Sequence, residues 1–433
     1  MEYLLVYLGV LVGLSGPLGL LRQHELRDYA QRLPDCHPYL RHGAGFWRDA
    51  WWQLHCSLQL VHPPHIAIEP RIAHDRFYRF LEATWMLQQL PWALLFFAWG
   101  GWGLVCWGVC ARVSAGVLGH WLIGYLHDFT NPSGNTYPIS QVSANWDVIV
   151  VSFADNAGNG NISFTVDPNA GTEAQFIADI KAKRAAGKKV VLSVGGQNGS
   201  ITLDNATMVT NFVNSAYALI QKYGFDGIDL DLENGITSGA AIQANLITAV
   251  KQLKAKVGSS FYLSMAPEHP YVQGGYITFA GIWGAYLPII DGLRNELTVL
   301  HVQYYNNGSF TYDNASNQMV SEGTVDGLVA GSLMLIEGFK TNYGAGWQFV
   351  GLRPDQVAFG VPSGPSSANT GFVTSTVVAN TLNCLTRLTN CGTIKPAKAY
   401  PTFLGAMTWS INWDKHDGYN FSTPTKAALN TLP

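Results

Sequence analysis

From Trp121 to the end of the chain, short apolar runs alternate with segments that have the periodicity of amphipathic helices. Repeated strand and helix units bury their apolar faces most simply as a parallel sheet covered by helices. Strands are expected at Leu122–His127, Asp147–Phe153, Lys189–Val194, Gly227–Glu233, Phe261–Ala266, Leu297–Tyr305, Val357–Val361 and Leu404–Trp409. Eight such units within residues 119–433 predict an α/β fold, a (β/α)8 TIM barrel.

Helix signals between these runs support the same interpretation. Thr172 and Gln175 have the spacing of a capping box, Phe176 and Ile180 fall on one helical face, and Gly187 is placed to end that helix. A doubly wound open sheet is the alternative arrangement of such units. No GxGxxG motif follows the first expected strand, so the sequence gives no support for a dinucleotide site.

The chain changes in composition at about residue 118. The first 118 residues hold nine Arg and no Lys, whereas 13 Lys and four Arg follow, and eight of the twelve His lie at or before His120. We therefore expect two unrelated parts, residues 1–118 and 119–433. The whole chain has 26 basic and 29 acidic residues, a balance that disfavours a polyanionic partner such as nucleic acid.

The first part contains two uncharged apolar runs, residues 3–21 and 90–111. At about 1.5 Å per residue each is roughly as long as a bilayer core is thick, so the sequence predicts an α-helical, membrane-like segment with membrane association through these runs. A signal peptide is the alternative for the first run, but Glu2 stands where a basic residue is expected. The Arg-rich loop between the runs predicts that both chain ends, and hence the second part, lie outside the cell.

The segment Phe225-Asp-Gly-Ile-Asp-Leu-Asp-Leu-Glu233 concentrates acidic residues on one face of an expected strand. Alternate side chains of a strand share a face, so Asp229, Asp231 and Glu233 point together, about 6.5 Å apart, into the barrel. Burying three carboxylates there costs several kcal/mol, which favours a functional site over a solvated acidic edge strand.

Repulsion among these carboxylates predicts a division of roles. Glu233, at the carboxyl end of the strand, is expected to have a raised pKa and to act as a proton donor, while Asp231 stays closer to the anionic side. A carboxylic acid beside a carboxylate can cleave a glycosidic bond. Spacing alone leaves open whether Asp231 is a covalent nucleophile.

The second part resembles glycoside hydrolase family 18, in particular bacterial chitinases of the chitinase D type. Its DGIDLDLE segment matches the family's DxxDxDxE motif, which begins at the structural Asp226, and Ser193, Gly195 and Gly196 match the SxGG motif. The resemblance implies a retaining, substrate-assisted mechanism without metal or cofactor. Glu233 would protonate the glycosidic oxygen, the substrate's N-acetyl carbonyl would attack the anomeric carbon, Asp231 would orient the acetamide, and Asp229 would support Asp231.

The same resemblance assigns further positions to a chitin-binding pocket. Tyr305 would hold the acetamide oxygen, and Trp409 would form the apolar floor beneath the sugar. The remaining candidate substrate-binding residues are Gln303, Asn306, Met265, Glu268, Ser193, Gly195, Gly196, Tyr125 and Phe153.

Three further expectations concern the type of protein. A non-catalytic chitin-binding lectin and an endo-β-N-acetylglucosaminidase acting on N-glycans are the alternatives to a chitinase, and Glu233 argues against the lectin. The short connection between the last two expected strands favours an endo-acting enzyme. The predicted topology places that enzyme outside the cell, either extracellular or anchored with its barrel on the outer face. Cys384 and Cys391 have a spacing suited to a loop disulfide.

The first part resembles a truncated bacterial membrane fatty-acyl desaturase, through residues 47–56, 75–102 and 119–125. The three His-rich boxes that hold a di-iron centre in that family are missing or degraded. A lone His24 stands where the second box is expected, and His55, His62, His65 and His74 form no HxxHH cluster. We therefore expect this part to be non-catalytic, and a membrane lipid-modifying function is disfavoured.

Overall fold

The computed structural model describes residues 119–433, in which eight strands form a closed and entirely parallel barrel. Each barrel strand pairs with the next along the chain, and β1 pairs with both β2 and β13, which closes the sheet. The barrel strands are β1 (Trp121–His127), β2 (Val148–Gly158), β4 (Lys189–Gly195), β5 (Gly227–Asp231), β6 (Tyr262–Met265), β7 (Val299–Gln303), β12 (Val357–Pro362) and β13 (Gly405–Trp409). They overlap all eight predicted strands, so the TIM barrel is confirmed and the open sheet is wrong.

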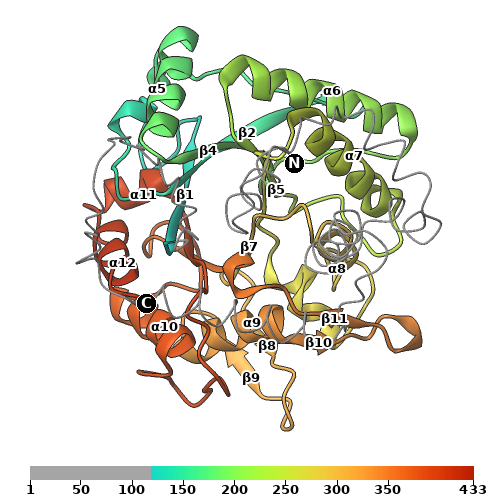
Figure 1. Cartoon of the computed structure of the whole chain (residues 1–433), viewed down its shortest axis with the longest axis vertical. Coiled ribbons are helices and arrows are strands. Elements are labelled where there is room, and N and C mark those ends of the chain that lie inside the picture. Colours follow the sequence, from blue (N-terminus) through green and yellow to red (C-terminus); the bar gives the residue numbers. More distant parts are fainter. Residues whose placement is uncertain (1–118) are drawn as a thin grey trace, which may run out of the picture. The chain divides into compact units, whose positions relative to one another are not determined.

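Helices surround this barrel in the part of the chain that the structure describes (Figure 1). They are α5 (Glu173–Ala185), α6 (Ala206–Tyr223), α7 (Ala241–Val257), α8 (Leu287–Gly292), α9 (Val325–Glu337), α10 (Ser375–Arg387), α11 (Ile411–His416) and α12 (Ser422–Leu429). The predicted limits of α5 are confirmed. At its start the Thr172 hydroxyl accepts the backbone N–H of Gln175, and just after its end Gly187 has a φ of 81°.

Small antiparallel strands are added to this frame. The strand β3 (Asn161–Ser163) pairs with the extended end of β2, β8 (Ser309–Thr311) pairs with β9 (Met319–Ser321), and β10 (Gly338–Lys340) pairs with β11 (Gln348–Val350). Between β12 and β13 the only helix is α10, and the described chain there forms no strands.

Buried apolar side chains form two separate clusters because successive residues of each strand point to opposite faces. On β5, Ile228 and Leu230 belong to the large cluster between the barrel and the helices. Asp229 and Asp231 point into the lumen, as predicted. The smaller cluster fills the lumen with residues such as Ile123, Val150, Tyr262, Val299 and Met407.

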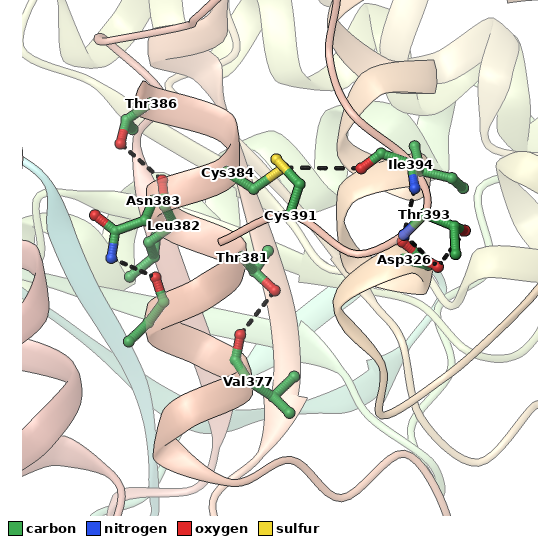
Figure 2. The surroundings of a disulfide bond; sticks show 11 residues. Asp326, Val377, Thr381, Leu382, Asn383, Cys384, Thr386, Cys391, Thr393 and Ile394 are labelled. Carbon is green, nitrogen blue, oxygen red and sulfur yellow. Dashed lines mark hydrogen bonds between the residues drawn. A yellow bond between two sulfur atoms is a disulfide. The ribbon is translucent and has the colours of Figure 1, made fainter. Parts of the chain in front are cut away.

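A disulfide between Cys384 and Cys391 joins α10 to the loop that follows it. Figure 2 shows that the same loop is also tied to α9, because the Asp326 carboxylate accepts the backbone N–H groups of Thr393 (3.1 Å) and Ile394 (2.9 Å). The disulfide that the spacing of Cys384 and Cys391 suits is therefore present.

The predictions made for residues 1–118 lie outside the described residues. They comprise the apolar runs 3–21 and 90–111, the desaturase-like segments 47–56 and 75–102, and the histidines at 24, 55, 62, 65 and 74. The third desaturase-like segment, 119–125, is described and contributes most of the barrel strand β1. Within residues 119–433, none of the helices combines the length and the apolarity that crossing a bilayer requires.

Truncating the outer face of β5 should destabilise the fold. Leu230 is completely buried, so Leu230→Ala should lower the free energy of unfolding by about 2–5 kcal/mol through lost contacts and a residual cavity. Val350→Ala is the control, because Val350 is 65% exposed and its truncation should change stability by less than about 0.5 kcal/mol. Urea unfolding of the full chain measures both values, and equal effects would contradict the assigned orientation of β5.

Candidate active site

A cleft of about 1200 Å³ lies at the carboxyl ends of the barrel strands. Residues at or just beyond the end of every barrel strand line it, which is where TIM barrels carry their active sites. The acidic residues of the lining are Asp128, Asp155, Asp231, Glu233 and Glu268. Within residues 119–433, the lining contains no Lys, Arg or His, so these carboxylates lack a neutralising cation in the cleft.

Two glycines let the end of β4 approach β5 closely. A Cβ atom on Gly195 would collide with the Asp231 carbonyl oxygen, and one on Gly196 would lie 2.7 Å from the Phe153 ring. Both glycines have positive φ, and the Gly196 N–H donates to the Asp231 carbonyl oxygen at 2.6 Å. The SxGG motif therefore fixes the backbone that carries Asp231, and both glycines line the cleft as expected.

The deepest carboxylate, Asp229, is fully buried and accepts three hydroxyl hydrogen bonds. Tyr125 and Ser193 donate to one oxygen, each at 2.7 Å, and Ser264 donates to the other at 2.6 Å. The His301 ring lies 3.7 Å from the second oxygen. Hydrogen bonds from neutral donors offset the cost of taking this group out of water.

Above Asp229, the side-chain amide of Gln303 joins the other two acids. Its Nε2 atom lies 2.8 Å from an Asp231 oxygen and 3.1 Å from a Glu233 oxygen, and it also donates to the Ala266 carbonyl at 2.8 Å. The Tyr271 hydroxyl donates to the Glu233 carbonyl oxygen at 2.6 Å. These contacts hold the end of β5 and keep the carboxylates of Asp231 and Glu233 next to one another above Asp229.

Burial raises the pKa of both upper acids. The pKa of Asp231 lies well above its usual range because of burial and then of the neighbouring charges of Glu233 and Asp229. Burial, with a smaller contribution from the charge of Glu268, raises the pKa of Glu233 to about 7 against the lowering effect of its hydrogen bond from Gln303. The raised pKa expected of Glu233 is therefore present.

The expected contrast between the two acids is not present. The sequence predicts that Asp231 stays more ionised than Glu233, but Asp231 is only 3% exposed and lies deeper in the barrel than the half-buried Glu233. Its greater desolvation favours the protonated form more strongly.

Aromatic side chains form one wall of the cleft. Phe153 lies nearly parallel to Trp409 with ring centroids 5.9 Å apart, and Tyr125 lies 5.8 Å from Trp409. A register shift in β2 between Val151 and Ala154 lets Phe153 reach the cleft. Tyr305 also lines the cleft, and burial followed by the charge of Asp231 raises the pKa of its hydroxyl well above the usual value, so that it remains a donor.

Two predicted substrate-binding residues lie elsewhere. The prediction that Met265 binds substrate is wrong. Met265 points outward from β6 into the core beneath the helices, while its neighbours Ser264 and Ala266 face the lumen. Ser193 is also wrong as a substrate contact, because it is fully buried below the cleft and donates to Asp229. Glu268, Gln303 and Asn306 line the cleft as expected, and their roles toward a ligand remain predictions.

Asp226 has a structural position at the opposite end of β5. Its carboxylate pairs with Arg184 (3.1 Å) and Lys189 (3.2 Å) and accepts the backbone N–H of Val190 at 3.0 Å. It therefore joins the amino ends of β4 and β5, which agrees with the structural role expected of the first acid in the motif.

Several residues at or near the site were not predicted from the sequence. Ser264 and His301 occupy lumen-facing positions of their strands, so the alternation used for β5 could have found them. Loop residues of the lining, among them Asp128, Phe129, Gln197, Asn234 and Asn369, carry no periodic signal. In the described part of the chain, no three His, Cys, Asp or Glu side chains are grouped so that they could hold a metal ion.

Comparisons with known proteins place this cleft in a wider group. A family model described as Glycosyl hydrolases family 18 matches residues 122–422. Chitinase Chi52 of Paenibacillus xylanexedens is 42% identical and Chitinase D of Niallia circulans is 41% identical, each over 72% of this chain. The chain spans 62% of the length of each of these two relatives.

A solved structure gives the same result. The crystal structure of a family GH18 chitinase from Chromobacterium violaceum is 65% identical, with a TM-score of 0.71. The match covers 72% of this chain and 84% of that one.

The raised pKa of Glu233 should make stability depend on pH. A carboxyl whose pKa rises from 4.5 to about 7 on folding binds its proton more tightly in the folded state, so stability is lost as pH rises through this window. Glu233→Gln removes the effect, and between pH 4.5 and 7 wild type should lose up to about 3 kcal/mol more than the variant. Urea unfolding at several pH values measures the difference, and parallel curves would contradict the raised pKa.

Proposed function

The chain belongs to glycosyl hydrolases family 18, and on that basis we propose that it is a chitinase. It would hydrolyse β-1,4 linkages between N-acetylglucosamine units with retention of configuration. The observation that carries this proposal is the position of Glu233, a carboxylic acid with a pKa of about 7 at the mouth of a cleft, directly above the buried Asp231.

Glu233 is the proposed general acid. Its pKa of about 7 keeps a substantial fraction protonated near neutral pH, where it can donate to the glycosidic oxygen as the bond breaks. Its side chain lines the cleft and is more exposed than that of Asp231, which lines the same cleft at a deeper level.

The substrate's own acetamide is the proposed nucleophile. Its carbonyl oxygen would attack the anomeric carbon and form an oxazolinium ion, which water then opens. Asp231 would accept the acetamide N–H, and the protonated hydroxyl of Tyr305 would donate to the acetamide oxygen. Asp229, fixed by its hydroxyl donors, would keep Asp231 in place from below.

Trp409 is the proposed floor under the reacting sugar. Its ring is held by Phe153 and Tyr125, and an aromatic face suits the C–H surface of a pyranose. Endo action is proposed because the described connection between β12 and β13 contains α10 and adds no inserted sheet that would deepen the cleft.

We place this activity outside the cell, where the disulfide between Cys384 and Cys391 would persist. Chitin or its oligosaccharides are the proposed partners. An endo-β-N-acetylglucosaminidase would use the same acids, so chitin oligosaccharides and N-glycans must be tried side by side.

Removing the acid should abolish hydrolysis without abolishing binding. Glu233→Gln keeps the shape of the side chain but donates no proton, so kcat on chitin oligosaccharides should fall about 10²- to 10⁴-fold while the Kd stays within a few-fold. Glu173→Gln, a change of an exposed Glu on α5, is the control. If Glu233→Gln retained turnover within tenfold of wild type, Glu233 would not be the acid. If wild type bound chitin oligosaccharides but did not hydrolyse them, the lectin would be favoured.

The identity of the nucleophile fixes the product and the substrate requirement. If the acetamide attacks, NMR of fresh hydrolysate should show the β-anomer first, and a chain with deacetylated sugars throughout should not be cleaved. Inverted product would contradict the retaining mechanism. Retention together with rapid cleavage of the fully deacetylated chain would instead indicate a protein nucleophile such as Asp231.

A further inference from the structure

Glu322 is a buried carboxylate beyond the sequence motifs, placed directly after the hairpin of β8 and β9. Its side chain is only 3% exposed, and it lies against His269, whose side chain is 2% exposed. The His269 Nε2 atom is 3.2 Å from a Glu322 oxygen. A buried pair of this kind is costly unless further hydrogen bonds satisfy the carboxylate.

Those further bonds come from two other loops. The backbone N–H of Asn307, after β7, donates to the same Glu322 oxygen at 2.9 Å. The hydroxyl of Thr370, after β12, donates to the other oxygen at 3.0 Å. Glu322 therefore contacts the loops that follow β6, β7 and β12.

Each of these loops supplies residues to the cleft. The side-chain amide of Asn307 donates to Glu268 at 2.7 Å, and Glu268 lines the cleft. Asn306, also in the lining, accepts the backbone N–H of Asn369 at 2.8 Å. We call Glu268, Asn306 and residues 365–369 the pinned wall.

The hairpin holds Glu322 in place. Phe310 on β8 is buried and packs on the His269 ring with centroids 4.9 Å apart. Burial alone would raise the pKa of Glu322, but the adjacent His269 ring and the nearby backbone N–H groups of Asn307 and Gly308 outweigh burial and hold the pKa below its usual range. These neighbours therefore stabilise the ionised form of the Glu322 carboxylate.

We propose that Glu322 is a positioning residue for substrate binding, which with His269 fixes the pinned wall of the cleft. It touches neither Asp231 nor Glu233, and it acts through Asn307 on Glu268 and through Thr370 on residues 365–369. The ligand in this inference, a chain of N-acetylglucosamine units, rests on the proposed function. The ordering of the loops by Glu322 does not depend on that function.

Kinetics of the full chain test the effect on substrate. Glu322→Gln should raise KM for a chitin hexasaccharide about tenfold while kcat stays within about threefold, because the acids of β5 are untouched. Glu268→Gln should also raise KM. In the double variant the increase should be smaller than the product of the two single increases, because Glu322 acts partly through Glu268. The proposal would be overturned if the KM increase of the double variant equalled the product of the two single increases, or if KM were unchanged in Glu322→Gln.

Hydrogen exchange tests the order of the loops without any substrate. In Glu322→Gln, backbone amides of residues 305–309 and 368–371 should exchange at least about tenfold faster than in wild type. The control is Glu337→Gln on α9, where an exposed Glu accepts the Tyr400 hydroxyl away from the cleft and should leave these amides unchanged. Unchanged exchange in Glu322→Gln would overturn the proposal.

A milder variant covers the case in which Glu322→Gln does not fold. Thr370→Val removes one hydrogen bond and should speed exchange at residues 368–371 and raise KM about threefold. Unaltered exchange in Thr370→Val would count against the proposal. If wild type does not hydrolyse chitin oligosaccharides, the proposed function fails, while the exchange results still decide whether Glu322 orders the wall.

Discussion

Burial of carboxylates inside a parallel barrel is the constraint on which this structure depends. A lumen normally filled by branched apolar side chains carries Asp229 with no exposed surface, and three hydroxyl groups from β1, β4 and β6 satisfy it. These donors are neutral, so they stabilise the negative charge without cancelling it. The pKa of Asp231 is raised by burial and then by the neighbouring carboxylates Glu233 and Asp229.

From that base the site becomes progressively more accessible. Asp231 is almost completely buried, Glu233 is half-buried, and the open cleft follows. Gln303 contacts both acids with a single amide group, so their positions are linked. Gly195, the last residue of β4, allows the backbone of Asp231 to lie where a side chain would otherwise collide, and Gly196 leaves room for the Phe153 ring. A donor at the mouth and a deeper polar partner thus arise from the depth of successive residues on one strand.

The sequence was sufficient for the barrel and for the acids on β5, because alternation with period two determines which face each strand residue occupies. Met265 shows what happens when that rule is not applied: its neighbours Ser264 and Ala266 face the lumen, so Met265 must face the helices. Ser193 was recognised by its motif, but its depth in the barrel could not be read from the chain. The relative pKa values of Asp231 and Glu233 also depend on depth, which the sequence does not encode locally.

The part of the site built from loops could not be predicted. Glu322 meets His269, Asn307 and Thr370 because three separate loops converge above the barrel, and no spacing in the chain records that convergence. The same holds for residues 365–369 in the cleft. Loop conformations follow from tertiary contacts, whereas strand faces follow from local periodicity.

The central claim is that burial keeps a proton on Glu233 near neutral pH. The most direct measurement is a carbon-13 NMR titration of its side-chain carboxyl, assigned by the signal that disappears in Glu233→Gln. The expected midpoint lies near pH 7. A midpoint near 4.5, the ordinary value for a solvated Glu, would contradict it.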